Sequence, residues 1–322
     1  MYYKETRELD YSDISLKPKR CIVESRSDCD TSVSFGNRKF DMPIYASNMK
    51  SVVDVETCKF FAQNNWFYTM HRFGISNIDF ILEMNKEDLF RSISVGINED
   101  SYNELNRIYQ ECLFIDYITI DVANAWSDKT KAMVKFIKKK FPDTFLIVGN
   151  IATAEALRDI QEWNIDAAKI GIAAGKVCIT KNKTGIHRKI VSTIENCCAV
   201  AKIPLIADGG IKEHGDVAKA LCCGATMIMA GSLFGGYDQS AGNIIEIGDR
   251  SYKEYYGSAS KYNKDEYKNI EGKKILIDYK GNMTKLLKEL KEDLQSSISY
   301  LGEKQLEFEG QNTLKDKECY LL

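Results

Sequence analysis

Short apolar runs alternate with amphipathic segments of helical length from residue 42 to residue 230. Eight of the runs are candidate strands: Met42–Ala46, Trp66–Met70, Ser92–Ile97, Tyr117–Val122, Thr144–Gly149, Ala167–Ile172, Ile203–Ala207 and Met227–Ala230. Helical periodicity is seen in Val52–Gln63, Glu104–Cys112, Lys129–Phe141, Ala154–Glu162, Lys189–Ala201 and Asp216–Cys222. Alternating strands and helices predict a parallel sheet.

The number of repeated units favours a closed barrel. Eight strand–helix units over roughly 200 residues are typical of a (β/α)8 TIM barrel. The alternative is an open doubly wound sheet, but no GxGxxG motif follows the first strand. We therefore predict an α/β fold, a TIM barrel formed by residues 1–322 as a single domain.

Two segments lie outside the repeat. Residues 237–280 are polar, contain glycine and tyrosine, and follow the eighth candidate strand, so they predict a flap inserted after that strand. Thr284–Leu301 resumes helical periodicity and is the predicted eighth helix. The polar tail, residues 302–322, is predicted either to reach a neighbouring subunit or to be disordered.

Charge and composition argue against several classes of protein. The net charge is −2, which gives no reason to expect nucleic acid or a membrane as a partner. No run approaches the ~20 apolar residues of a membrane helix, and the N-terminal MYYKETRELDY lacks the apolar core of a signal peptide, so a cytoplasmic location is expected. The ten cysteines are then expected to stay reduced. Without a CxxC motif, and with three histidines, a zinc site is not expected.

Polar and glycine residues follow seven of the eight candidate strands. They are Ser47-Asn48-Met49, His71-Arg72, Asp121 with Asn124, Gly149-Asn150, Cys178 with Thr180, Asp208-Gly209-Gly210 and Gly231-Ser232. Function in a barrel of this kind is carried by the loops at the carboxyl ends of the strands. The pattern therefore predicts a site at that face.

Cys178 and Thr180 stand two residues apart in a glycine-bearing loop after the sixth candidate strand. In an extended or irregular segment this spacing places a thiol and a hydroxyl on the same side of the backbone. Lys176, Lys181 and Lys183 make the surroundings electropositive, which favours a nucleophilic thiolate. The alternative for a lone cysteine is a small buried thiol that packs as an apolar residue.

The next two loops carry groups suited to a nucleotide. The carboxylate of Asp208 can accept hydrogen bonds from the hydroxyls of a ribose, and Gly209-Gly210 lets backbone approach a ligand closely. Gly231-Ser232 offers backbone N–H groups and a hydroxyl to a phosphate, which TIM barrels often bind after strands seven and eight. Tight turns are the alternative for each loop, but together they favour a nucleoside monophosphate.

Long motifs make the chain similar to the IMP dehydrogenase/GMP reductase family over nearly its whole length. They include DYSDISLKPKRC, MPIYASNM, YTMHRF, YITIDVAN, GKVCITKNKTG, PLIADGGIKEHGDVAKAL, MIMAGSLFGG and NIEGKK. Two observations favour the reductase branch. Gly74–Arg91 has no room for the pair of regulatory modules that dehydrogenases usually carry there, and residues 237–280 contain Glu271 but no adjacent Arg-Tyr pair.

The resemblance implies NADPH-dependent reductive deamination of GMP to IMP and ammonia through a cysteine thioimidate. It implies Cys178, Thr180 and Glu271 as catalytic residues. It implies substrate contacts from Asp208, Gly209, Gly210, Gly231, Ser232, Gly257, Ser258 and Ala259. It implies NADPH contacts from Ser25, Arg26, Arg72, Asp121, Val122 and Ala123. It also implies a monovalent cation such as K⁺ on carbonyls of Ala173, Gly175 and Cys178, and a homotetramer.

Departures from the family pattern cluster at this site. Ala173 and Ala174 replace residues of a GxGPG motif, and a positive φ at Ala173 would cost roughly 1 kcal/mol or more. Ile186–Lys189 stands where a glycine and a glutamine are expected, while Ser47 and Ala125 also differ from the pattern. An active reductase remains the prediction. A dehydrogenase without regulatory modules and a non-catalytic purine-nucleotide-binding protein are the alternatives.

Overall fold

A curled parallel sheet forms the centre of the computed structural model, which describes residues 7–263, 270–308 and 310–322. Its seven strands lie in the order β4-β10-β9-β8-β7-β6-β5. Their bounds are β4 Ile44–Ala46, β5 Ser92–Val95, β6 Tyr117–Asp121, β7 Phe145–Ile151, β8 Ala167–Ile170, β9 Leu205–Asp208 and β10 Met227–Ala230. Seven of the predicted strands are thereby confirmed. The parallel register brings all their carboxyl ends to one edge, which is the edge that the sequence predicts for the site.

The predicted strand Trp66–Met70 is wrong as a regular strand. The segment is buried between the two ends of the sheet. Met70 forms a backbone hydrogen bond to β5, and Asn65, the residue before the segment, accepts one from the residues that lead into β4. Asp41 N–H donates to the Asn65 carbonyl before β4 (3.0 Å), and Met70 N–H donates to the Ser92 carbonyl of β5 (3.0 Å). The Tyr68 hydroxyl donates to the Phe90 carbonyl, so aromatic packing rather than a regular ladder holds this part of the chain.

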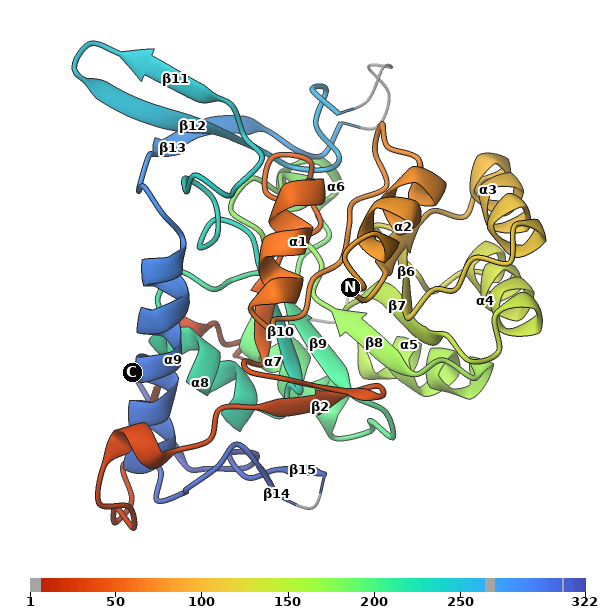
Figure 1. Ribbon diagram of the computed structural model, residues 1–322. Helices are drawn as coiled ribbons and strands as arrows, with labels where there is room; N and C mark the ends of the chain where they lie inside the picture. The colour runs from red at the N-terminus through yellow and green to blue at the C-terminus, as the bar shows by residue number, and fades with distance from the viewer. Residues whose placement is uncertain (1–6, 264–269, 309) are drawn as a thin grey trace.

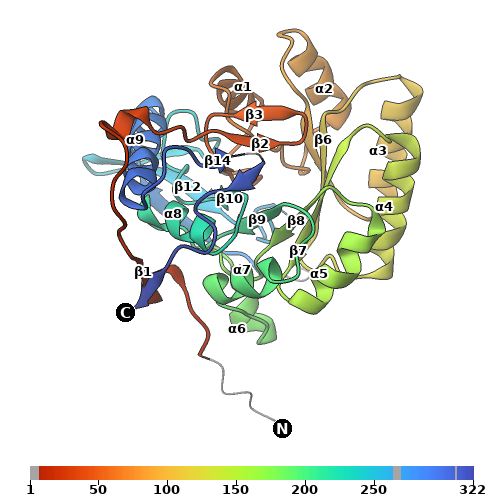
Figure 2. The same cartoon turned by 90° about the horizontal axis from the view of Figure 1, so that it is seen from below.

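Helices surround the sheet, as Figure 2 shows from below. Their bounds are α1 Val55–Gln63, α2 Asn77–Asn85, α3 Glu99–Gln110, α4 Asp128–Lys140, α5 Ala154–Ile160, α7 Ile190–Cys198, α8 Gly215–Cys222 and α9 Thr284–Tyr300. Side chains of Asp54, Ser76, Asn98, Ser127 and Thr153 accept hydrogen bonds from backbone N–H groups at the starts of α1 to α5. These caps fix where each helix begins. No helix among the described residues is long and apolar enough to cross a membrane.

Residues between β10 and α9, the segment predicted as an insertion, form a three-stranded antiparallel sheet. It comprises β11 Ile244–Ile247, β12 Arg250–Tyr256 and β13 Lys274–Asp278, and it projects from the body in Figure 1. Residues 264–269, part of the predicted flap, lie outside the described residues. The insertion is anchored to the body, because Ser51 Oγ donates to the Tyr256 carbonyl (2.9 Å) and Gly272 forms a bridge with Cys178.

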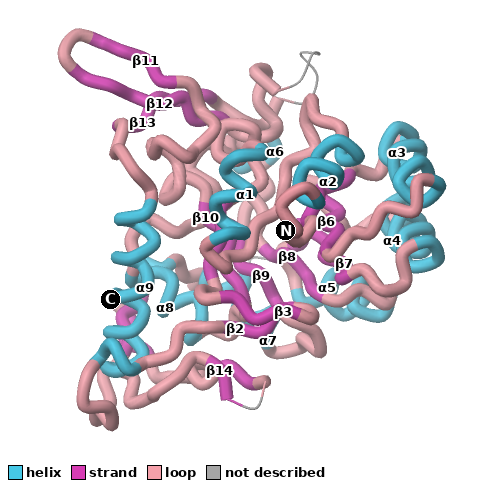
Figure 3. The backbone as a smooth tube through the Cα atoms, viewed as in Figure 1, coloured by secondary structure: helices cyan, strands magenta, loops and turns pink. Residues whose placement is uncertain are grey.

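The two ends of the chain pair with each other. β1 (Ile14–Leu16) is antiparallel to β16 (Cys319–Leu321), and a small hairpin, β14 Glu307–Phe308 with β15 Gln311–Asn312, precedes β16. The described end of the tail thus lies beside β1, as Figure 2 shows. A second hairpin, β2 Val33–Phe35 with β3 Arg38–Phe40, packs its phenylalanines against Tyr117. Figure 3 shows β14 at the same end of the molecule as β2 and β3. The described residues also include three short 3₁₀ helices: η1 Tyr11–Asp13, η2 Arg26–Asp28 and η3 Gln161–Trp163.

Candidate active site

A cavity of about 750 Å³ opens at the carboxyl edge of the sheet. Loops after the strands line it on one side, and residues of the insertion line it on the other. The structure brings together most of the predicted site residues here: Cys178, Thr180, Glu271, Asp208, Gly209, Gly210, Gly231, Ser232, Gly257, Ser258, Ala259, Arg72, Asp121, Val122, Ala123, Ala173 and Gly175. Ser25 and Arg26 do not line it.

Cys178, Thr180 and Glu271 form a continuous chain of polar contacts. Cys178 Sγ lies 3.1 Å from Thr180 Oγ1, and the Thr180 hydroxyl donates to Glu271 Oε2 over 2.6 Å. Because that hydroxyl has its single proton directed at the carboxylate, its oxygen is free to accept the proton of the thiol. The arrangement therefore connects a sulfur nucleophile to a carboxylate through one hydroxyl.

Local backbone structure holds these three side chains in place. A turn closed by Cys178 N–H and the Gly175 carbonyl (3.1 Å) precedes the cysteine, and a short helix, α6 (Thr180–Thr184), begins at the threonine. The sequence interpretation as a loop throughout was wrong for α6. Ile179 N–H donates to the Glu271 carbonyl over 2.8 Å, so the insertion reaches the cysteine loop through backbone as well as through its carboxylate.

Ala173, which replaces a glycine of the family motif, adopts a positive φ. Its φ is +64°, in the left-handed region that favours glycine. The preceding Gly171 has a φ of +128°, and a Cβ there would overlap the Asp208 carbonyl of the neighbouring strand. The loop that carries Cys178 thus begins with a bend after β8. This bend has no room for a side chain at Gly171 and holds the backbone of Ala173 in a strained conformation.

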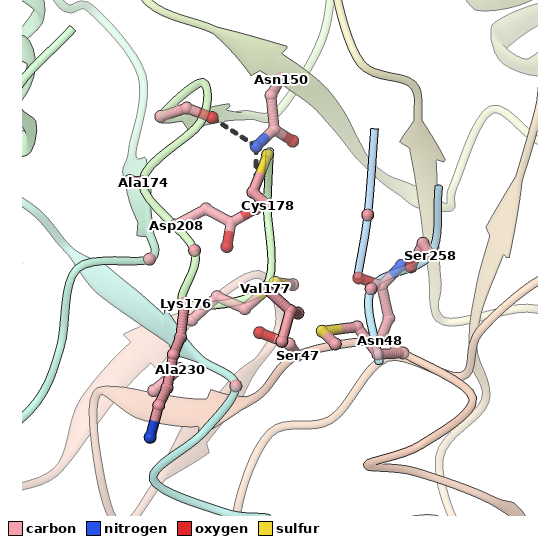
Figure 4. Close-up of a pocket in the computed structure, with 18 of the residues that line it drawn as sticks. Ser47, Asn48, Asn150, Ala174, Lys176, Val177, Cys178, Asp208, Ala230 and Ser258 are labelled. Carbon is pink, nitrogen blue, oxygen red and sulfur yellow. Dashed lines mark hydrogen bonds between the residues drawn. The ribbon is translucent and has the colours of Figure 1, made fainter. Parts of the chain in front are cut away.

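A buried lysine joins two carboxylates beneath the cavity. Lys169 on β8 is 2% exposed, and its ammonium donates to Asp121 Oδ1 (2.9 Å) and to Asp208 Oδ2 (3.1 Å). Asn150 Nδ2 also donates to Asp208 Oδ2 (2.8 Å) and to the Gly171 carbonyl (2.7 Å), and Figure 4 shows Asn150, Asp208 and Cys178 around the same pocket. Burial opposes the charged form of Lys169, but the two carboxylates outweigh it and raise its pKa. Burial likewise opposes ionisation of Asp121, and Lys169 nevertheless lowers the pKa of that carboxyl.

The cavity contains polar groups and positive charge. Gly209 and Gly210 have φ values of +94° and +82°, so glycine is required for this backbone. Lys176 and Lys280 also line the cavity, and burial together with the charge of Lys176 lowers the pKa of Lys280. Two like charges brought into one cavity favour an anionic ligand. The sequence analysis missed Lys280, and it also missed Tyr255, whose ring lines the same wall.

The predicted cofactor residues separate into two groups. Arg72, Asp121, Val122 and Ala123 line the cavity, and Arg72 Nε donates to the Asp121 carbonyl (3.2 Å). Ser25 and Arg26 lie instead at η2, where Arg26 packs over the Tyr300 ring of α9. These two residues therefore belong to a different surface from the cavity of the same chain.

The departures after the cysteine loop have local partners. Arg188 Nε donates to Glu8 Oε1 (2.9 Å), and Lys189 Nζ donates to Asp13 Oδ2 (2.9 Å). Ile190 N–H donates to Asp10 Oδ1 (3.1 Å), so residues 8–13 hold the start of α7. In residues 186–189, where the family pattern has a glycine and a glutamine, Arg188 and Lys189 thus form ion pairs with the N-terminal segment.

The cysteines and the other possible metal-ligating side chains are dispersed in the part of the chain that the structure describes. All ten cysteines are free, and within the residues described no three His, Cys, Asp or Glu side chains gather as metal ligands. The predicted cation ligands are backbone carbonyls at Ala173, Gly175 and Cys178. One of them, the Gly175 carbonyl, already accepts the Cys178 N–H, which leaves it one further lone pair.

Comparison with known proteins places the chain in a family. The family model for the IMP dehydrogenase / GMP reductase domain matches residues 8–315. A protein named GMP reductase from Chromobacterium violaceum is 60% identical over 295 residues, covering 92% of this chain and 93% of that protein. GMP reductases from Acidovorax sp. and Staphylococcus aureus are 48% and 47% identical, each with 92% of both chains covered. The chain belongs to the IMP dehydrogenase/GMP reductase family.

Proposed function

We propose that the protein catalyses the NADPH-dependent reductive deamination of GMP to IMP and ammonia. The observation that carries the proposal is the contact chain from Cys178 through Thr180 to Glu271, in a cavity with groups suited to a nucleotide. Relatives that cover nearly the whole chain bear the name GMP reductase, which supports the same reaction.

The proposed first step removes the amino group. The Cys178 sulfur attacks C2 of the guanine ring, and its proton passes to the amine by way of Thr180 and Glu271. The C2–N bond breaks, ammonia leaves, and a C2–S thioimidate remains. NADPH, when bound, supplies the hydride that C2 needs. The C2–S bond then breaks, which releases IMP and returns the electron pair to the Cys178 sulfur.

The remaining lining residues are proposed to hold the ligands. Asp208 would accept hydrogen bonds from the ribose of GMP, with the phosphate on Gly209, Gly210, Gly231 and Ser232 and the base beside Gly257, Ser258 and Ala259. The donor set beside them fits the cofactor. Asp121 offers a carboxylate to ribose hydroxyls, Arg72 offers a guanidinium to phosphate, and Val122 and Ala123 leave apolar space for the ring.

Further features of the assembly follow from the same proposal. Ser25 and Arg26 would meet the cofactor of a second copy in a homotetramer, because they lie away from the cavity of their own chain. The chain would act in the cytoplasm as a single domain. The seven-stranded sheet, with the irregular segment Trp66–Met70 between its two ends, would act as a TIM barrel, and residues 237–280 would act as its flap. A K⁺ ion would bind the carbonyls of Ala173, Gly175 and Cys178.

The test is the near-ultraviolet absorbance of NADPH mixed with the purified protein and GMP. A GMP-dependent loss of absorbance in the wild type, absent in Cys178→Ala, is the expected result. A rise with NAD⁺ and IMP, and no loss with GMP, would identify a dehydrogenase. GMP binding in calorimetry without turnover in either direction would leave a nucleotide-binding protein.

A further inference from the structure

We propose that Lys169 is a positioning residue that keeps Asp121 and Asp208 ionised together, so that nucleotide and cofactor can occupy the cavity at the same time. The inference rests on the proposed function, which assigns Asp208 to the nucleotide ribose and Asp121 to the cofactor. It adds a lysine that lies beneath both ligands.

The geometry makes Lys169 the common partner of both carboxylates. Its Nζ lies 2.9 Å from Asp121 Oδ1 and 3.1 Å from Asp208 Oδ2, so these two oxygens lie no more than about 6 Å apart. The three residues come from β6, β8 and β9, which are not all adjacent in the sheet. A lysine on β8, between the strands that carry the two carboxylates, is therefore the side chain that can reach both.

Electrostatics predicts what the site would do without this ammonium. Two carboxylates at such a separation in a buried site repel each other, and one of them takes up a proton. A protonated carboxyl has lost part of its capacity to accept hydrogen bonds from ribose hydroxyls. Without Lys169, only one of the two carboxyls would be ionised at a time. The ligand bound to the ionised carboxylate would therefore weaken binding of the other ligand.

Other groups near the pair do not replace the lysine. They include Arg72, which lowers the pKa of Asp121 and also donates to its backbone, Asn48, which supplies a side-chain hydrogen bond to Asp121, and the phenols of Tyr11, Tyr45 and Tyr255, whose pKa values the carboxylates raise. Burial raises the pKa of each of these phenols, so they remain neutral near pH 7. Asn150 donates to Asp208 but carries no charge.

The experiment compares Lys169→Met, Lys169→Arg and a matched control, Lys59→Met. Lys59 is also a buried lysine between two carboxylates (9% exposed; Glu83 at 2.7 Å and Glu87 at 2.8 Å), but it lies on α1 outside the cavity. Calorimetry measures the affinity for IMP alone and for IMP in saturating NADP⁺. Steady-state kinetics measures KM for GMP and for NADPH from pH 6 to 9 (roughly the span over which a shared carboxyl proton is released). Thermal melting reports folding of each variant.

In Lys169→Met, we expect saturating NADP⁺ to weaken IMP binding about tenfold to a hundredfold relative to wild type, the range for losing a hydrogen bond to a charged group. Raising the pH should restore part of that loss. Lys169→Arg should recover most of the coupling because it keeps the charge. Lys59→Met should lower the melting temperature and leave both KM values and their pH dependence unchanged.

Two results would overturn the inference. One is Lys169→Met with wild-type coupling between IMP and NADP⁺. The other is a loss that is equal for each ligand alone, independent of pH and not repaired by arginine, as a purely structural role would give. If Lys169→Met does not fold, the double variant Lys169→Met/Asp121→Asn, compared with Asp121→Asn alone, decides the question. The double variant keeps one carboxylate with no second negative charge beside it, so IMP alone should bind it as tightly as it binds Asp121→Asn. Weaker IMP binding by the double variant at every pH would overturn the inference. Absence of GMP turnover in the wild type would instead contradict the proposed function. Calorimetry would still measure the effect of NADP⁺ on IMP affinity and so test the role of Lys169 separately.

Discussion

Ala173 lies in the cysteine loop with a φ of +64°, and we expect Ala173→Gly to stabilise the protein. An L-residue in the left-handed region costs about 1–2 kcal/mol relative to the right-handed one. Glycine does not incur this cost, but it loses about 0.4–1 kcal/mol through its greater freedom in the unfolded chain. The difference predicts a free energy of unfolding higher by about 0.5–1 kcal/mol.

Ala174 provides the matched control for this substitution. It is the next residue in the same loop and does not have a positive φ, and its Cβ lies close to Gly209. Ala174→Gly therefore relieves no strain and removes a contact, so it should lower the free energy of unfolding by about 0.4–1 kcal/mol.

Urea denaturation of the two variants and the wild type, followed by fluorescence, measures both changes. The urea concentration at the midpoint should be highest for Ala173→Gly, intermediate for the wild type and lowest for Ala174→Gly. The dependence of the unfolding free energy on urea concentration should be the same for all three proteins. An Ala173→Gly protein that is less stable than wild type, or as unstable as Ala174→Gly, would refute the reasoning from φ.

Three further substitutions test other parts of the site. In Glu271→Gln the Thr180 hydroxyl has no carboxylate to receive its proton, so kcat for GMP should fall about 10²–10⁴-fold with a similar KM in steady-state assays; an unchanged kcat would contradict the relay. Burial lowers the pKa of His71 from 6.5 to about 4. As the pH falls, the imidazole of His71 is therefore protonated in the unfolded chain before it is protonated in the folded protein. The free energy of unfolding of the wild type should fall by about 3 kcal/mol between pH 6.5 and about 4. In His71→Gln, denaturation should show a free energy of unfolding that changes less with pH. An equal slope would remove this assignment. A Cβ in Gly231→Ala would overlap the Tyr255 hydroxyl, so it should cost about 1–3 kcal/mol in denaturation experiments and cost less in a Tyr255→Phe background. Equal costs in both backgrounds would show that another contact is responsible.

Periodicity predicted the sheet well because a buried parallel strand needs a short apolar run, whatever its partners. The same criterion failed at Trp66–Met70, whose apolar side chains report burial and carry no information on backbone pairing. The edge that carries the site was also predictable. Parallel strands place their carboxyl ends together, so polar residues after several strands converge without any knowledge of which strands are neighbours.

Lys169 shows why part of the site escaped sequence reasoning. A single lysine inside an apolar run has no periodic signature, and its partners Asp121 and Asp208 are 48 and 39 residues away in the chain. Cys178 and Glu271 are also distant in sequence. Cys178 was predicted from its glycine-bearing loop and the neighbouring lysines as well as from a family motif, whereas Glu271 was predicted from a family motif alone. Lys280 lies in no such motif. Its lowered pKa results from burial and from the charge of Lys176, which is distant in the sequence and near only in the folded protein.

Hydrogen bonds between residues 8–13 and the start of α7 connect the N-terminal segment to the loop that borders the cavity. Leu9 N–H donates to Ser192 Oγ (2.8 Å), and Ile190 N–H donates to Asp10 Oδ1 (3.1 Å). Each of these hydrogen bonds must open before its amide can exchange with solvent deuterium. A nucleotide that immobilises the loop around Cys178 also restrains the segment that leads from it into α7. Deuterium uptake at Leu9 and Ile190 should therefore slow when the cavity is filled, although neither residue lines it.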